Sequence, residues 1–131
     1  MTRSLGLALL LLTLCAAGAS AGTKVGFYGC RGFVAKHPTA VVEPRSIMVA
    51  CGDGNFYVTG IRWTAWTGTS AKGTGKVHAN DCKPYCAAGH FHTKTGSVAL
   101  SKVISCKGAR VFTYIRVTSP IDNYAGSFDC R

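Results

Sequence analysis

The chain has 131 residues, with 15 Lys and Arg against five Asp and Glu, and its formal net charge is +10 at pH 7. This length allows one domain with a modest core, and so few acids argue against a glycosidase that works with paired carboxylates. The positive balance predicts attraction to polyanions, or else serves solubility.

Residues 1–21 have the pattern of a secretory signal peptide. Arg3 supplies a positive start, residues 5–14 are almost entirely apolar, and Ala19 and Ala21 flank Ser20 as a small-residue cleavage site. The apolar stretch is too short to span a bilayer. We therefore expect a secreted, extracellular mature domain of residues 22–131, with no transmembrane segment after signal cleavage and a net charge of +9 once Arg3 is removed.

The mature part is predicted to be one all-β domain. Runs of β-branched and aromatic residues alternate with Gly, Asn, Asp and Ser, and no long helical periodicity is present. The candidate strands are 24–34, 45–51, 55–67, 71–78, 97–106, 110–118 and 124–128. About six or seven strands with one apolar face each favour a small antiparallel β-sandwich, with a barrel as the alternative.

The turn at Asp53 and Gly54 is the clearest local signal, because Asp-Gly between two apolar runs favours a hairpin with a type I′ turn. In the strand that follows, alternation predicts Tyr57, Ile61 and Trp63 on one face. Trp63 and Trp66 are three residues apart, so a regular strand would place them on opposite faces. Core packing is favoured for both, and Trp66 is also a candidate binding residue.

Residues 80–92 are predicted to form a loop, interrupted by Pro84 and Gly89. His90 and His92 form an H-x-H pair that, with His78, is a weak candidate for acid–base catalysis on a phosphodiester or for a transition-metal site. Plain surface histidines are the simpler interpretation, and we expect no metal.

The strand 110–118 is predicted to carry a second candidate site. Val111, Ile115 and Val117 would face the core, and the opposite face would present a row of aromatic and basic side chains that can stack on sugars or bases and hold phosphate or carboxylate. That row comprises Arg110, Phe112, Tyr114 and Arg116, widened by Arg62. The alternative is that Phe112 and Tyr114 belong to the core.

Cysteine usage agrees with export. Cys15 leaves with the signal peptide, and six cysteines remain: Cys30, Cys51, Cys82, Cys86, Cys106 and Cys130. An even set in a short exported domain predicts three disulfides, with 15 possible pairings. A zinc site at Cys82 and Cys86 is disfavoured in an oxidising compartment, and no motif for a cofactor is present.

Several motifs together resemble small secreted proteins of actinobacteria, most of them uncharacterised. They are Cys-Gly-Asp-Gly-Asn at 51–55, Trp-x-x-Trp at 63–66, Asn-Asp-Cys-x-Pro-x-Cys-Ala-x-Gly at 80–89 and Cys-x-Gly at 106–108. The resemblance implies an exported small domain and no particular activity. Since Cys30 and Cys130 lie outside the resembling stretch, it also suggests that these two cysteines pair.

The leading hypothesis from sequence is a non-enzymatic binding or structural module of the cell envelope or extracellular space. Its basic surface would contact an anionic polymer (a cell-wall polymer, nucleic acid or glycan) or a partner protein. One alternative is a ribonuclease-like secreted phosphodiesterase that uses His78, His90 or His92. The other is a secreted toxin or inhibitor that docks through the 80–92 loop.

Overall fold

The computed structural model describes residues 24–30 and 40–130; the predicted signal peptide lies outside these residues. The described chain is an all-β domain joined by three disulfides, which confirms the fold class expected from sequence. Its elements are β1 (Gly26–Phe27), β2 (Ile47–Met48), β3 (Phe56–Trp66), β4 (Ala71–Asn80), the 3₁₀ turn η1 (Cys86–Ala88), β5 (Phe91–Cys106), β6 (Ala109–Thr118) and β7 (Asn123–Ser127).

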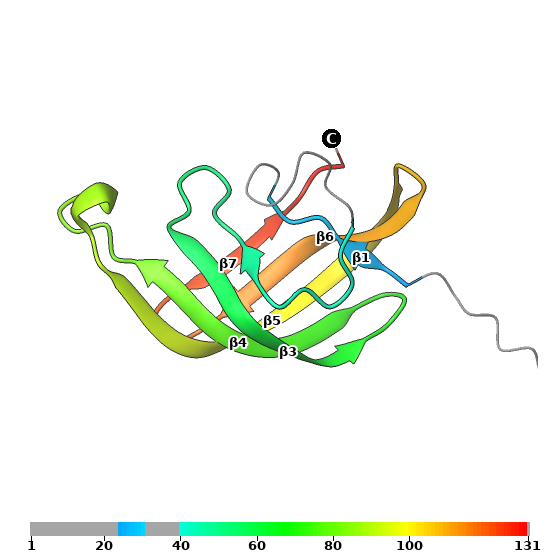
Figure 1. The fold of residues 1–131 in the computed structure, drawn as a ribbon, viewed down its shortest axis with the longest axis horizontal. Helices are drawn as coiled ribbons and strands as arrows, with labels where there is room; N and C mark the ends of the chain where they lie inside the picture. Colours follow the sequence, from blue (N-terminus) through cyan, green and yellow to red (C-terminus); the bar gives the residue numbers. More distant parts are fainter. Residues whose placement is uncertain (1–23, 31–39, 131) are drawn as a thin grey trace, which may run out of the picture.

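These seven strands form a single sheet in the order β1-β6-β5-β4-β3-β2, and β7 also pairs with β6. Every pairing is antiparallel except that of β1 with β6. The sheet curls into an open trough, with β3 and β4 on one side and β6 and β7 on the other (Figure 1). Of the two expected architectures, the structure is therefore closer to the barrel than to the sandwich.

The core fills the concave side of this trough. Alternation along β4 is strict, because Val77 is fully buried while Lys72, Thr74 and Lys76 are exposed. Val111, Ile115 and Val117 are buried as the sequence predicted. The trough is bridged by aromatic contacts, since Phe56 of β3 stacks on Tyr124 of β7 with 6.0 Å between ring centroids.

Two β-bulges bend β3 and change which of its side chains face the core. The register with β4 shifts once between Thr59 and Arg62, where Gly60 has φ of 59°, and again between Trp63 and Ala65. Each bulge adds an unpaired residue and bends the strand. The inner face consequently carries Val58 and Ile61, and Tyr57 lies on the outer face.

The second bulge also brings the two tryptophans together. Trp63 and Trp66 pack edge to face, with 4.7 Å between ring centroids, and both lie against the core. The prediction that they point to opposite faces is wrong, because it assumed an unbroken period of two. Their indole N–H groups donate to backbone oxygens of Pro44 and Val25, so both rings anchor the chain that precedes β2 and β1.

The bounds of several strands and the type of one turn differ from those predicted. β5 begins at Phe91 instead of residue 97, so the loop spans only residues 81–90. The strands predicted at 24–34 and 45–51 shrink to β1 and β2, and residues 31–34 lie outside the described part of the chain. The Asp53–Gly54 hairpin forms between β2 and β3, but Gly54 alone of the two has positive φ, so the turn is not type I′.

The disulfides join Cys30 to Cys51, Cys82 to Cys86, and Cys106 to Cys130. The pairing of Cys30 with Cys130 suggested by the resemblance is therefore wrong. Cys30 follows β1 and its partner follows β2, whereas Cys130 follows β7 and its partner ends β5. The first bridge thus links the segments that follow β1 and β2, the two strands at opposite ends of the strand order, and the last links the segment after β7 to the end of β5.

Candidate functional site

The outer face of the sheet, opposite the core, consists of rows of side chains that cross the strands. In antiparallel pairs, residues directly opposite each other point to the same side. From the end near the 81–90 loop, the rows are Tyr57, His78 and Thr93; Thr59, Lys76 and Thr95; Arg62, Thr74, Ser97 and Thr118; and Ala65, Lys72, Ala99 and Arg116. We call this surface the outer face throughout.

The outer face is basic. Arg62, Lys72, Lys76 and Arg116 are all exposed. None of these four cations forms an ion pair with another described residue. The ion pair found among the described residues joins His92 and Asp81. The five long strands contain no Asp or Glu at all. The acids lie in turns and connecting segments: Glu43, Asp53, Asp81, Asp122 and Asp129.

Hydroxyl groups lie between these cations. Thr59, Thr74, Thr95, Ser97 and Thr118 are on the same rows, and all but the half-buried Thr59 are exposed. The Lys76 ammonium donates to the Thr95 hydroxyl at 3.2 Å, which holds one cation over the sheet. Cations with neighbouring hydroxyl donors are the groups that contact phosphate, sulfate or carboxylate oxygens.

At the loop end of the outer face, His78 is fixed between neighbours. Its Nε2 and Nδ1 atoms are each 2.9 Å from a hydroxyl, those of Thr59 and Thr93 respectively. The ring also stacks on Tyr57, with centroids 4.5 Å apart, and the Phe91 ring lies 5.5 Å from Tyr57. Both ring nitrogens of His78 are therefore occupied, which suits a structural role better than proton transfer.

Asp81 organises the loop between β4 and β5. Its carboxylate accepts hydrogen bonds from the backbone N–H of His90, from the His92 ring and from the backbone N–H of Lys83, each at 3.0–3.1 Å. These bonds, the one from His90 foremost, hold the pKa of Asp81 far below its usual range. Asp53 has a lowered pKa for the same kind of reason, a hydrogen bond from the backbone N–H of Asn55.

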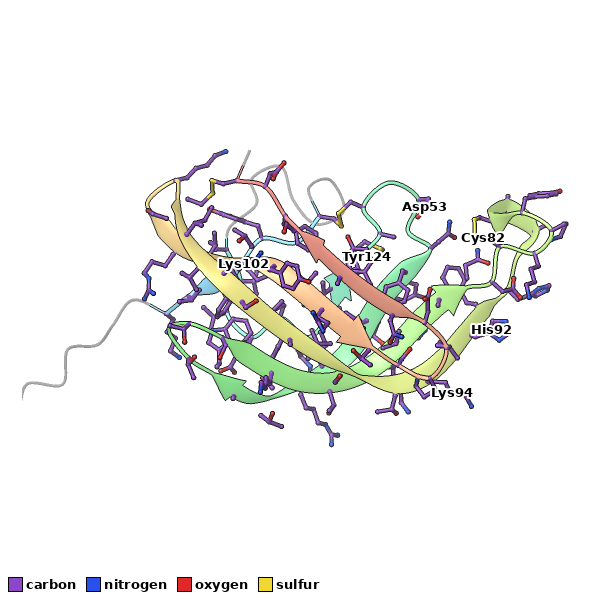
Figure 2. All side chains as sticks on the ribbon, turned by 180° about the vertical axis from the view of Figure 1, so that it is seen from behind. Asp53, Cys82, His92, Lys94, Lys102 and Tyr124 are labelled. Carbon is purple, nitrogen blue, oxygen red and sulfur yellow. A yellow bond between two sulfur atoms is a disulfide. The ribbon has the colours of Figure 1, made fainter. Side chains whose placement is uncertain are left out.

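Two of the histidines proposed as a catalytic or metal site, His78 and His92, lie on opposite faces of the sheet. His78 points to the outer face with Thr93, whereas His92 is the adjacent residue to Thr93 and points to the inner side. Figure 2 shows His92 and Lys94 near the loop end of β5, remote from Lys102. Within residues 24–30 and 40–130, no group of three or more His, Cys, Asp or Glu side chains could hold a metal ion.

The predicted aromatic and basic row on β6 is split by the fold. Phe112 is only 2% exposed and packs against the half-buried Trp66, which removes Phe112 as a surface binding residue. Arg110 donates to the backbone oxygen of Gly68 at 2.9 Å. Tyr114 is half-buried beneath the Lys102 ammonium, which lies 4.8 Å from the ring centroid. Arg116 remains with Arg62 on the outer face.

Sequence reasoning did not assign Lys72 and Lys76, the central cations of this face, to a binding surface. The signal was present in Ala71-Lys-Gly-Thr-Gly-Lys-Val77, where small residues alternate with polar ones. Because the inward-facing positions are glycine instead of large apolar residues, the strand lacks the alternation of apolar and polar residues that usually marks its two faces. Gly73 and Gly75 are required there because an added Cβ would lie 2.7 Å from the Arg62 oxygen and 2.8 Å from Val58, respectively.

Comparison with protein-family models, curated proteins and solved structures finds no match. The function has to be argued from the chain's own geometry. Among the described residues, no helix is long and apolar enough to cross a membrane.

Proposed function

We propose that this protein is a non-enzymatic binding module whose outer face contacts an anionic polymer outside the cytoplasm. The observation that carries the proposal is the exposed set Arg62, Lys72, Lys76 and Arg116 on strands that contain no acid. Three disulfides suit an oxidising compartment, and the signal-peptide pattern of residues 1–21 supports export.

The shape of the outer face suits an extended chain of regularly spaced charges. Successive rows lie about 6.6–6.8 Å apart along the strands, and neighbouring strands are about 4.8 Å apart. The three rows from Lys76 to Arg116 each carry at least one cation, so a polymer lying across them meets positive charge at every row. Cell-wall polyphosphates, acidic glycans and single-stranded nucleic acids all present charges in this manner.

The test is binding of the disulfide-linked domain to three labelled polymers: poly(glycerol phosphate), heparin and a single-stranded RNA. We expect the logarithm of the binding constant to fall linearly with the logarithm of salt concentration, with a slope of about −0.7 per phosphate contact for the single strand. Changing Arg62, Lys72, Lys76 and Arg116 together to Gln should weaken binding at least about tenfold and flatten the slope.

A matched control variant has the same net charge as this four-residue variant but leaves the cations of the outer face unchanged. Lys24, Arg45, Lys83 and Lys94 are exposed cations elsewhere, and changing these four to Gln should weaken binding much less. Equal losses in the two variants would show that net charge alone attracts the polymer and would contradict the proposal. Cleavage of the RNA that disappears with His78→Ala or His92→Ala would favour the ribonuclease-like alternative instead.

A second candidate, docking of the 81–90 loop into a partner protein's cleft, is favoured by the exposure of Tyr85. This side chain is 63% exposed at the tip, on a loop fixed by the Cys82–Cys86 disulfide and the Asp81 hydrogen bonds. A rigid tip with an exposed aromatic residue loses little entropy on binding. Capture of one stoichiometric partner by the intact protein, lost with Tyr85→Ala, would support it.

A further inference from the structure

The first half of β5 is an edge of the described sheet. β5 pairs with β4 from Phe91 onward, but β6 reaches only as far as Ser97, which pairs with Thr118. Along residues 91–96, β5 therefore has a neighbouring strand on one side only. This edge lies where β4 and β5 extend beyond β6 toward the loop at the far end of the sheet (Figure 1).

The hydrogen-bond pattern decides which backbone groups face outward. The N–H of Asp81 donates to the oxygen of His90 at 3.0 Å, which makes 81 and 90 a hydrogen-bonded pair. In an antiparallel ladder such pairs recur every second residue, so His92 and Lys94 direct their backbone groups toward β4. Phe91, Thr93 and Thr95 consequently direct theirs away from it, and within the described chain no backbone partner meets them.

The surroundings of this edge are positively charged and partly apolar. His92 and Lys94 flank Thr93 on the inner side, and Phe91, 48% exposed, lies on the outer side. The nearest acid, Asp81, already accepts hydrogen bonds from the loop and from His92. The edge thus offers backbone hydrogen bonds beside the exposed ammonium group of Lys94.

A second copy of this chain fits the edge poorly. Antiparallel self-pairing centred on Thr93 would place Lys94 of one copy opposite His92 of the other, and each chain has a net charge of +10. Repulsion between two strongly basic chains opposes such pairing. An acidic strand has the complementary charge.

From these observations we propose that residues 91–95 of β5 bind an extended acidic peptide, which adds to the sheet as a further antiparallel strand. In this arrangement the peptide residues opposite Phe91, Thr93 and Thr95 exchange backbone hydrogen bonds with β5. The intervening peptide residues lie on the inner side beside His92 and Lys94, and carboxylates belong at those positions. This site does not depend on polymer binding by the outer face.

The probe is a fluorescently labelled peptide of five Asp-Thr repeats, compared with the same peptide N-methylated at every threonine. Both carry the same charge, but only the first can donate backbone hydrogen bonds from its threonines. At 0.15 M salt we expect the unmethylated peptide to bind at least about tenfold more tightly, because two or three backbone bonds are lost on methylation. Equal affinities would show attraction by charge alone and would overturn the proposal.

Two variants at the centre of the edge separate the backbone from the side chain. Thr93→Pro and Thr93→Ala both lose the hydroxyl that contacts His78, but only proline also loses the N–H. Proline is tolerated where an edge N–H faces solvent. The unmethylated peptide should bind Thr93→Ala nearly as tightly as the unaltered protein, and should bind a folded Thr93→Pro protein several-fold more weakly, because the bond from the Thr93 N–H to the peptide is lost. Equal affinities of the two folded variants would overturn the proposal.

Amide hydrogen exchange on the unaltered protein gives a measurement that does not depend on either variant folding. Saturating unmethylated peptide should slow exchange at Phe91, Thr93 and Thr95 at least about tenfold and leave Lys94, already bonded to β4, nearly unchanged. Protection confined to other segments would place the peptide elsewhere and contradict the proposal.

Discussion

The body of the sheet and the arm at its end are stabilised in different ways. The body holds the buried core, in which Val58, Leu100 and Ile115 are at most 1% exposed. The arm, which we define as residues 80–95, contains no buried residue. It is fixed instead by strand pairing of residues 91–95 with β4, by the Cys82–Cys86 disulfide and by hydrogen bonds between side chains and backbone, chiefly those of Asn80 and Asp81.

This difference shows how a small domain can place the residues that stabilise its fold apart from the surfaces that remain accessible to a partner. The body buries one face of its strands and leaves the opposite face free for cations and hydroxyl groups. The arm has no buried side chains, so its strand edge, Tyr85 and Phe91 remain accessible to solvent. Short-range polar contacts keep the arm ordered without covering it.

The largest expected contrast concerns the disulfides. Cys106–Cys130 closes a separation of 24 residues and Cys82–Cys86 one of only 4. The loop-closure relation gives about 3.5 kcal/mol for the first and about 2 kcal/mol for the second. Denaturant unfolding of the two paired Cys→Ser variants should show the larger loss of global stability for the body disulfide. If loss of the arm disulfide lowered the free energy of unfolding as much as loss of the body disulfide, or more, the proposed difference between body and arm would be contradicted.

A smaller effect is expected from adding one methyl group at matched glycines. In Gly73→Ala the new Cβ would lie 2.7 Å from the Arg62 oxygen and 3.0 Å from Trp63, whereas at Gly52 no atom lies within 4 Å. Overpacking of the body should cost Gly73→Ala about 1–3 kcal/mol. Gly52→Ala should stay within about 0.5 kcal/mol, as surface changes usually do. Thermal unfolding measures both, and similar melting temperatures would contradict the close packing of β3 on β4.

The smallest effect concerns the pH dependence of the arm. Because the pKa of Asp81 is depressed in the folded chain, its contribution to order is fully present above the ordinary aspartate value, about 3.9, and is lost only as pH falls well below it. The acid transition of the Lys83 amide resonance, which reports protonation of Asp81, should therefore have its midpoint well below about pH 3.9. In Asp81→Asn this acid transition should be absent. A midpoint near 3.9 in the unaltered protein would show that the Asp81 hydrogen bonds do not hold in solution.

The sequence predicted the strands well and the faces of β3 poorly. Apolar runs and turn residues located β3, β4 and β6 to within two residues at each end. The bulges at Gly60 and after Trp63 were not visible in the pattern, because a bulge changes the alternation without changing composition. An unbroken period of two therefore put Tyr57 on the wrong face and separated two tryptophans that touch.

The candidate sites were only partly predictable for related reasons. Arg62 and Arg116 were recognised, but Phe112 is drawn into the core by Trp66, a residue 46 positions earlier in the chain. The free edge of β5 depends on where β6 ends relative to β4, which is a property of register. Disulfide pairing likewise requires knowing that β1 and β2 end near one another.

The most direct test of the central proposal is a two-dimensional NMR titration of the isotope-labelled domain with poly(glycerol phosphate) at low salt. Binding through the outer face predicts that the largest changes in amide chemical shift occur in the rows that contain Lys76, Arg62, Lys72 and Arg116. These changes should all decrease together as the salt concentration is raised. Shifts spread evenly over all exposed lysines and arginines, or confined to residues 81–90, would contradict it.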